Sequence, residues 1–467
     1  MRSALRYFFT LVLRIFFRRI EISGAEHVPS SGPILFVLNH PNGLIDPGFL
    51  LCLAPRRVSF LAKAPLFRMP VVGWLCRTFQ AIPVHRRQDA GSDPAQNRET
   101  FEAARRVLAG GGAIAIFPEG TSHNDPQLRP FKTGAARIAL GAAAALGENT
   151  RPIRIVPAGL YYRAKQTFRS AALLHYGAPF EVPSITLALG ADPPAAAVLA
   201  LTERIGTALA ELTLQAERVE ALALVARAQR IFSTADEPPT TPASLAQELE
   251  VRRRFVLGYR LLRERWPDRF TAVQARIDRY ESALQAAGLD HRHLTPRTYT
   301  LARVLRYVVQ SVLVFALLLP PALAGALVHY PAYRIVGYVA TGISKGDESA
   351  LATVKLLAAT LLFPLTWAAV AVAVWIWTKG NLVATVGTVA VLPVAGLLAL
   401  VFFERMDRMI GRIRALGLLL FKKWPFMRLV AERRAIREEI LALGKELGLT
   451  AGALPERAPP AKDPGSV

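Results

Sequence analysis

One short stretch of the 467-residue sequence places a histidine and a carboxylate where they could act together as a base. The run LFVLNHPNGLIDPGFL has an apolar segment that ends at His40, a Pro-Asn-Gly turn, and then Asp46. An imidazole can take a proton from a hydroxyl near neutral pH, and a carboxylate can hold the ring in the required tautomer. We therefore predict that His40 is a general base oriented by Asp46. Asp46 also fits as the cap of a helix beginning near Pro47, and the two roles are compatible.

A second stretch, IAIFPEGTSHND, ends an apolar run in a turn that suits ligand binding. Glycine lets backbone amides approach a ligand closely, so Gly120 and Thr121 are predicted to border a substrate. Glu119 adds a carboxylate that can accept hydrogen bonds from substrate hydroxyls. Lys132 follows at the start of a predicted helix, beside Gly134, where a phosphate contact is favourable.

Two arginines, Arg86 and Arg87, follow the apolar run AIPV and a histidine. Guanidinium groups bind phosphate oxygens with two parallel hydrogen bonds, so we predict a phosphate ligand here. Either arginine alone is more typical of a solvated surface charge. His123 lies close to the second stretch, where a substrate contact and a structural role both stay open. The sequence contains no cluster of Cys and His with metal-ligand spacing, so we expect neither a metal nor a bound cofactor.

These residues require an α/β scaffold that brings the ends of several strands together. From residue 33 to about 183, short apolar runs alternate with helical ones, which predicts a mixed sheet covered by helices. In such sheets, functional residues lie in loops beyond the strand ends. Strands are expected at 33–40, 57–63, 79–85, 112–120, 153–162 and near 175–182, and helices at 96–109, 131–146 and 194–232.

The composition indicates contact with a membrane. Hydrophobic residues make up 52% of the chain, the mean hydropathy is +0.29, and the net charge is +22. Such a charge calls for an anionic partner, and the sequence has no zinc spacing or RNA-binding signature that would favour nucleic acid. Membrane lipids are the expected partner. The two cysteines, Cys52 and Cys76, lie in apolar stretches and are expected to be small buried side chains.

Both ends of the chain carry segments that suit a bilayer. Arg2, Arg6, Thr10, Arg14 and Arg18 recur every four residues, which predicts an amphipathic helix in the membrane interface, with a core-packing helix as the alternative. The apolar stretches 307–329, 353–377 and 381–403 are each long enough to span a bilayer. Pro320 and Pro321 predict that the first is re-entrant or kinked, and residues 378–381 predict a hairpin turn between the other two.

The expected layout has six parts: an interfacial helix at 1–20, a catalytic domain at 21–235, a soluble helical segment at 236–300, a transmembrane region at 301–403, basic juxtamembrane helices at 404–450 and a disordered tail at 451–467. Ser244 and Gln247 predict a capping box at the start of a helix after a Pro-rich linker. The density of Arg and Lys after residue 403 predicts that this side of the membrane is cytoplasmic. We expect the catalytic domain on the cytoplasmic face of the cell (inner) membrane.

Four blocks in order, NHPNGLID, IPVHRR, FPEGTS and VPAGLYY, resemble the glycerolipid acyltransferase family that uses a His-and-Asp motif. The resemblance covers roughly residues 20–185 and implies that His40 is the base on the acceptor hydroxyl and that Asp46 orients it. It also implies that Arg86 or Arg87 binds the acceptor's phosphate, that 117–120 shapes the acceptor site, and that the block around Pro157 helps to hold the acyl donor.

Two departures from the common family pattern point to a subgroup. Five residues separate His40 from Asp46, where four are usual, and Ser122–His123 stands where the family often has arginine. Both features resemble the fungal glycerol-3-phosphate and dihydroxyacetone-phosphate acyltransferases. The resemblance implies transfer of an acyl group from acyl-CoA or acyl carrier protein to glycerol-3-phosphate, with lysophosphatidate as the alternative acceptor. A non-catalytic lipid-binding scaffold is the alternative of another class, and intact His40 and Asp46 argue against it.

Overall fold

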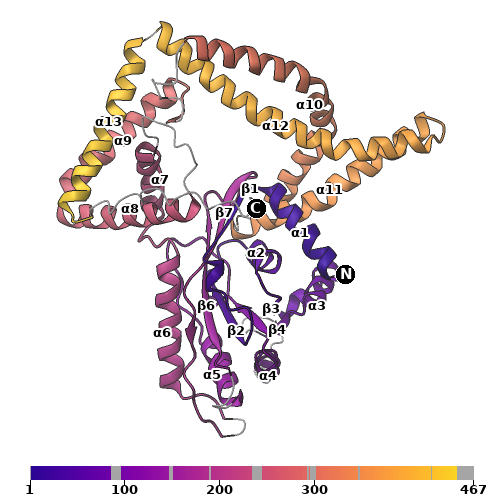
Figure 1. Ribbon diagram of the computed structural model, residues 1–467, viewed down its shortest axis with the longest axis vertical. Coiled ribbons are helices and arrows are strands. Elements are labelled where there is room, and N and C mark those ends of the chain that lie inside the picture. Colours follow the sequence, from indigo (N-terminus) through magenta and orange to yellow (C-terminus); the bar gives the residue numbers. More distant parts are fainter. Residues whose placement is uncertain are drawn as a thin grey trace, which may run out of the picture. The chain divides into compact units, whose positions relative to one another are not determined.

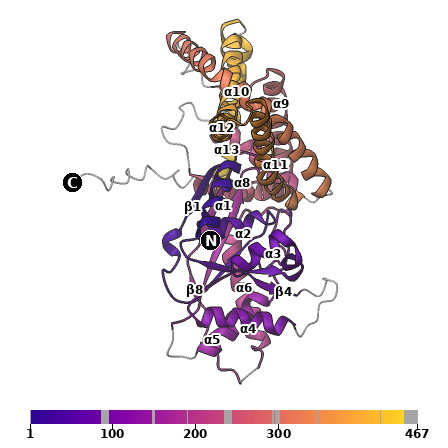
Figure 2. The same ribbon diagram turned by 90° about the vertical axis from the view of Figure 1, so that its right-hand side faces the viewer.

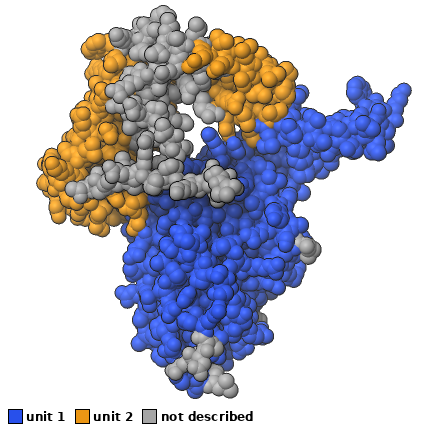
Figure 3. All heavy atoms as spheres, in the orientation of Figure 1, with its two compact units in different colours: residues 1–215, 244–249, 323–397 blue, residues 216–243, 250–322, 398–467 orange. Residues whose placement is uncertain are grey.

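The computed structural model describes residues 2–85, 96–146, 151–188, 191–233, 244–291, 294, 301–344, 346, 348–421 and 423–449. The chain divides into two compact units (Figure 3). The catalytic unit comprises residues 1–215, 244–249 and 323–397, and the helical unit comprises residues 216–243, 250–322 and 398–467. This division differs from the expected layout, because the helical unit joins segments from both sides of the apolar region.

The catalytic unit is built on a mixed sheet of eight strands among the described residues: β1 (Phe17–Ser23), β2 (Ile34–Leu38), β3 (Val58–Lys63), β4 (Ile82–Val84), β5 (Ala113–Ile116), β6 (Arg154–Tyr162), β7 (Ser170–Tyr176) and β8 (Phe180–Glu181). Their order is β1-β7-β6-β2-β5-β3-β4, and β8 pairs with β6. Neighbouring strands from β6 through β4 run parallel, whereas β7 and β8 are antiparallel to β6. The predicted α/β fold with a mixed sheet is confirmed.

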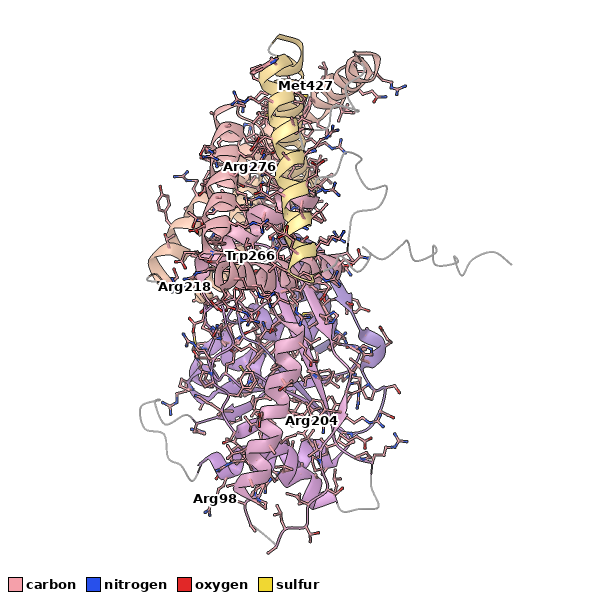
Figure 4. All side chains as sticks on the ribbon, turned by 90° about the vertical axis from the view of Figure 1, so that its left-hand side faces the viewer. Arg98, Arg204, Arg218, Trp266, Arg276 and Met427 are labelled. Atoms are coloured by element: carbon pink, nitrogen blue, oxygen red, sulfur yellow. The ribbon has the colours of Figure 1, made fainter. Side chains whose placement is uncertain are left out.

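Helices cover both faces of this sheet (Figures 1 and 2). Because side chains alternate along a strand, β2 sends Ile34, Phe36 and Leu38 into one core and Leu35 and Val37 into the other. The first core is closed by α1 (Arg2–Phe16) and α2 (Ile45–Leu53), and the second by α4 (Gln96–Ala109), α5 (Gly134–Leu146) and α6 (Ala195–Leu212). A further helix, α3 (Pro70–Thr78), leads into β4. Arg204 of α6, labelled in Figure 4, lies over the ring of Phe180.

The N-terminal helix is shorter than predicted. It ends at Phe16, and the next residues form β1, which pairs with β7 at the edge of the sheet. The segment RRIEIS alternates charged and apolar side chains, which is the pattern of a half-exposed strand and which overrode the helical spacing of the arginines. The polar stripe of the helix therefore ends before Arg18.

Two of the stripe's arginines face the protein. Arg6 donates to the carbonyls of Cys52 and Ala54 at 2.9 and 2.8 Å, and Arg2 donates to the carbonyl of Val58 at 3.0 Å. The C-terminal carbonyls of α2 have no partner within their own helix, so Arg6 supplies one, whereas Arg2 bonds the start of β3. Leu13 and Phe16 of α1 are buried in the first core, whereas Tyr7, Phe8, Leu11 and Ile15 are exposed. The exposed apolar side chains retain the character expected of an interfacial helix, whose contact with lipid stays a prediction.

The helical unit contains α7 (Val219–Ser233), most of α8 (Leu245–Arg265), α9 (Pro267–Ala286) and α13 (Lys423–Glu446), which share one apolar core. Pro267 has no amide hydrogen and starts a new helix, so the soluble segment that was expected to be helical contains two helices, α8 and α9, in this stretch. The capping box at Ser244 and Gln247 is confirmed, with both of its hydrogen bonds at 3.0 Å. Arg276 of α9 (Figure 4) donates to Glu432 and Glu439 of α13, both at 2.7 Å.

Three helices in the described part of the chain are long and apolar enough to cross a membrane: α10 (Leu301–Ser344), α11 (Glu348–Trp377) and α12 (Leu382–Phe421). Helix α10 continues through Pro320 and Pro321, so these prolines do not end the helix, and the predicted kink or re-entrant path stays a prediction. Apolar helices tolerate proline where neighbouring groups or small adjustments satisfy the freed carbonyls. The predicted turn at 378–381 is confirmed, since it joins α11 to α12.

Candidate active site

The predicted catalytic residues meet at one edge of the sheet. Strands β2, β5 and β6 are adjacent and parallel, so their carboxyl ends open on the same side. His40 lies two residues beyond β2, Glu119 lies three residues beyond β5, and Tyr162 is the last residue of β6. Residues far apart in the sequence are thereby brought to one site.

His40 and Asp46 form the predicted pair. The Nδ1 atom of His40 lies 2.8 Å from Oδ2 of Asp46, and the carboxylate is fully buried while the imidazole is 15% exposed. A carboxylate oxygen can only accept a hydrogen bond, so Nδ1 carries the proton and Nε2 keeps its lone pair. The five-residue separation is therefore compatible with a bonded pair. In the neutral ring, Nε2 is the nitrogen without a proton and is suited to act as a base.

Asp46 is held in place from two sides. Its Oδ2 accepts the backbone N–H of Asn42 at 2.6 Å, and its Oδ1 accepts the hydroxyl of Tyr162 at 2.7 Å. Burial, and next the Asp46 carboxylate, raise the pKa of Tyr162 well above its ordinary value, so the phenol stays protonated and donates. Asp46 also lies in the first turn of α2, where a negative charge is favourable. It is not the cap that the sequence predicted near Pro47, because α2 begins at Ile45, its N-cap is Leu44, and no side chain makes a cap hydrogen bond.

The histidine ring is fixed by packing as well. It stacks on Phe117 with the ring centroids 4.1 Å apart and an interplanar angle of 17°. The preceding residue, Asn39, continues the pairing of β2 with its side chain, accepting the N–H of Leu160 at 2.7 Å and donating to its carbonyl at 3.0 Å. Two hydrogen bonds therefore join the residue before His40 to β6 beyond the end of the strand pairing.

The carboxylate of Glu119 has hydrogen-bond partners within the protein. Its Oε1 accepts the backbone N–H of His40 at 3.0 Å, and its Oε2 accepts the backbone N–H of Arg129 at 2.9 Å and contacts the ring of His123. The side chain is buried, so both oxygens are engaged inside the protein. The sequence could not show that the carboxylate is occupied by backbone groups. The geometry favours a residue that positions His40 over one that binds a substrate hydroxyl.

His123 supports Glu119. Its Nδ1 accepts the backbone N–H of Asp125 at 3.2 Å, so its Nε2 carries the proton and donates to Glu119. Its own backbone N–H donates to the carbonyl of His40 at 3.2 Å. Both ring nitrogens are used within the protein, which favours the structural alternative for this residue.

The turn after β5 also brings Lys132 to the site. Gly120 has φ +74°, and a side chain at this position would meet the end of Lys132. The amide of Gly120 donates to the carbonyl of Phe117 at 2.9 Å and closes the turn, and the predicted contact of Gly120 with a substrate stays a prediction. Thr121 follows directly, with its hydroxyl 3.4 Å from the carbonyl of Ser122. A phosphate contact by Lys132 stays a prediction.

Arg86 and Arg87 lie outside the described residues, so their predicted role as phosphate ligands stays a prediction. The strand that precedes them, β4, is parallel to β3 and ends at Val84. Pro157, at the centre of the fourth block, is buried inside β6 opposite Val37. The residue of that block that touches the catalytic pair is instead Tyr162.

Several residues of the site were not predicted from the sequence. For Tyr162, the one available signal was its position at the end of an apolar strand, because His40 lies just after another such strand. Lys165 donates to the carbonyl of Pro41 at 2.9 Å. Ser349 and Thr353 reach the catalytic loops from α11, at a sequence distance that no local pattern reveals.

Comparisons with known proteins agree with this geometry. Residues 19–161 match the family model described as Acyltransferase, and residues 225–450 match the model of the Glycerol-3-phosphate acyltransferase 2 C-terminal domain. The chain therefore contains an acyltransferase domain, followed by a region similar to the C-terminal domain of glycerol-3-phosphate acyltransferase 2.

Three relatives illustrate the similarity. Glycerol-3-phosphate O-acyltransferase 2 of Saccharomyces cerevisiae is 30% identical over 287 residues, which are 58% of this chain and 37% of the relative. Glycerol-3-phosphate O-acyltransferase 1 of the same yeast is 25% identical over 455 residues, 76% of this chain and 59% of the relative. A chloroplastic 1-acyl-sn-glycerol-3-phosphate acyltransferase of Brassica napus is 32% identical over 144 residues, 31% of this chain and 39% of the relative. The chain spans less than two thirds of the length of each of these relatives.

Proposed function

We propose that this protein is an O-acyltransferase that moves a fatty acyl group from acyl-CoA or acyl carrier protein to a hydroxyl of glycerol-3-phosphate, with dihydroxyacetone phosphate as a further acceptor. The observation that carries the proposal is the His40–Asp46 pair, in which the buried carboxylate engages Nδ1 and leaves Nε2 of the partly exposed imidazole available as the base. The choice of acceptor is supported by the match of residues 225–450 to the Glycerol-3-phosphate acyltransferase 2 C-terminal domain. The relative named for an already acylated acceptor matches only 31% of the chain.

The geometry supports a direct transfer. As the acceptor oxygen attacks the thioester carbonyl, Nε2 of His40 takes the hydroxyl proton, and the Asp46 carboxylate stabilises the imidazolium that forms. When the C–O bond is complete and the C–S bond breaks, the imidazolium returns the proton to the thiolate. His40 is then neutral again, so no covalent enzyme intermediate is needed.

The remaining residues are assigned to phosphate binding, to positioning His40 and to holding the protein in the membrane. Arg86, Arg87 and Lys132 supply positive charge for the acceptor's phosphate, with Thr121 at the rim of the site. Glu119 keeps His40 in place. The apolar helices α10, α11 and α12 hold the protein in the membrane, and we place the catalytic unit on the cytoplasmic face of the cell's inner membrane, where acyl donors are made.

An acceptor panel tests the proposal. The purified full-length protein in lipid vesicles is given glycerol-3-phosphate, dihydroxyacetone phosphate or lysophosphatidate, each with acyl-CoA and with acyl carrier protein. We expect the highest kcat/KM with glycerol-3-phosphate. A preference for lysophosphatidate would replace the proposed acceptor, and absence of transfer with every pair would favour the scaffold alternative.

A further inference from the structure

The membrane helix α11 changes character after its first two turns. Ser349, Ala352 and Thr353 are buried, and Ala352 belongs to the first core of the catalytic unit. Further along the same helix, Leu357 and Leu361 are 41% and 71% exposed. A helix built only to sit in lipid would show no such step, so the start of α11 is part of the folded catalytic unit.

Each of the two catalytic loops has a hydrogen bond to this buried start. The backbone N–H of Leu44, in the loop between His40 and Asp46, donates to Oγ1 of Thr353 at 3.0 Å. The hydroxyl of Ser122, in the loop after Glu119, lies 3.0 Å from the hydroxyl of Ser349. The two contacts come from residues four apart on one helix, which therefore face the same side.

The loop itself is shaped for this contact. Gly43 has φ +45°, and a Cβ at this position would lie 2.7 Å from Oγ1 of Thr353 and 3.0 Å from the carbonyl oxygen of Ser349. A side chain there would thus be both strained and in collision with α11. Gly43, which lies in the five-residue stretch between His40 and Asp46, therefore allows α11 to approach the loop this closely.

We propose that Thr353 and Ser349 are positioning residues, through which the membrane helix α11 holds the loops that carry His40, Asp46 and Glu119. This inference rests on the proposed acyl transfer. Leu44 immediately precedes α2, whose first turn carries Asp46, so the bond to Thr353 fixes the start of that helix. The start of α11 then positions the catalytic residues, in addition to the role of this helix in holding the protein in the membrane.

Removing the hydrogen bonds of Thr353 and Ser349, which together form the structural clamp on the catalytic loops, should lower kcat and leave substrate binding unchanged. Neither hydroxyl is placed in the binding of acceptor or donor, whereas the His40–Asp46 geometry must be held closely for proton transfer. A displacement of about 1 Å lowers rates by up to about 100-fold. We therefore expect Thr353→Val to lower kcat roughly 10- to 100-fold, with KM values for both substrates unchanged within about twofold.

Four variants of the full-length protein in vesicles test this inference. Thr353→Val removes the hydroxyl and keeps the shape, and Thr353→Ser restores an acceptor. Ser349→Ala removes the second bond. Thr360→Val is the matched control, because the hydroxyl of Thr360 donates to Leu356 of its own helix at 2.8 Å. We expect loss of kcat in Thr353→Val and a smaller loss in Ser349→Ala, with wild-type rates in Thr353→Ser and Thr360→Val.

Hydrogen exchange of the segment 40–46 gives a readout independent of turnover. The amide of Leu44 should exchange at least 10-fold faster in Thr353→Val than in the control. Equal exchange and equal kcat in Thr353→Val and Thr360→Val would overturn the inference, as would a change in acceptor KM with kcat unaffected. Wild-type protein that transfers no acyl group would count against the proposed function, while faster exchange at Leu44 in Thr353→Val would still support the structural clamp.

Discussion

Replacing Glu119 by glutamine tests whether this carboxylate positions the base or binds the substrate. The carboxylate accepts two backbone N–H groups, from His40 at 3.0 Å and from Arg129 at 2.9 Å, through different oxygens. An amide has one oxygen, and its NH2 group cannot accept a hydrogen bond. In Glu119→Gln, one of these backbone donors must therefore lose its partner.

The size of the effect follows from that lost bond. Leaving a buried donor without an acceptor costs about 1–3 kcal/mol. For a unit of this size, each kcal/mol lowers Tm by about 2–4 °C, so we expect a decrease of about 2–12 °C. The oxygen that serves both Arg129 and His123 satisfies more partners, so the bond to His40 is the one expected to break. Displacement of His40 then lowers kcat on the order of 10- to 100-fold.

Thermal unfolding and steady-state kinetics of the same preparation measure both effects. The control is Glu26→Gln, the same chemical change at an exposed position of the catalytic unit, which should leave Tm and kcat unchanged. An increase in the acceptor's KM with kcat and Tm unaffected would refute the positioning role. It would return Glu119 to the role expected from the sequence, as a ligand of the substrate's hydroxyls.

Three further changes have distinct expected results. Asp46→Asn should lower kcat on the order of 10²–10⁴-fold while the protein still folds, and a kinetically silent variant would limit Asp46 to a structural role in the first turn of α2. Tyr162→Phe removes the 2.7 Å bond to Asp46 and should lower the free energy of unfolding by about 1.5–3 kcal/mol in chemical denaturation, which an unchanged midpoint would contradict. Arg86→Ala should raise the acceptor's KM about 10- to 150-fold with the donor's KM unchanged. An effect confined to Arg87→Ala would assign phosphate binding to Arg87, and no effect in either variant would exclude phosphate binding by these arginines.

The sequence predicted those parts of the site that are set by neighbours in the chain. His40 and Asp46 are six positions apart, so a strand followed by a turn and a helix start is enough to bring them close together. The apolar runs likewise predicted most strands of the sheet, because parallel strands buried on both faces are continuously apolar. β1 was missed since its alternating charges also fit a helical spacing.

The parts that could not be predicted depend on distant contacts. Glu119 looked like a substrate ligand because nothing local reveals that the backbone of His40, 79 positions away, occupies it. Thr353 lies 309 positions from Leu44 in a segment whose composition indicates only a membrane span. Pro320 and Pro321 suggested a break, yet a proline's effect on an apolar helix is decided by surroundings that the sequence does not show.

The most direct test of the account is the turnover of His40→Ala in vesicles, measured with the preferred acceptor at saturating donor. Loss of the base should reduce kcat on the order of 10²–10⁴-fold. Tm and membrane insertion should stay close to those of the wild type, and His27→Ala, in the short helix before β2, should keep full turnover. If His40→Ala retained more than about half of the wild-type kcat, His40 would not be the base that this mechanism requires.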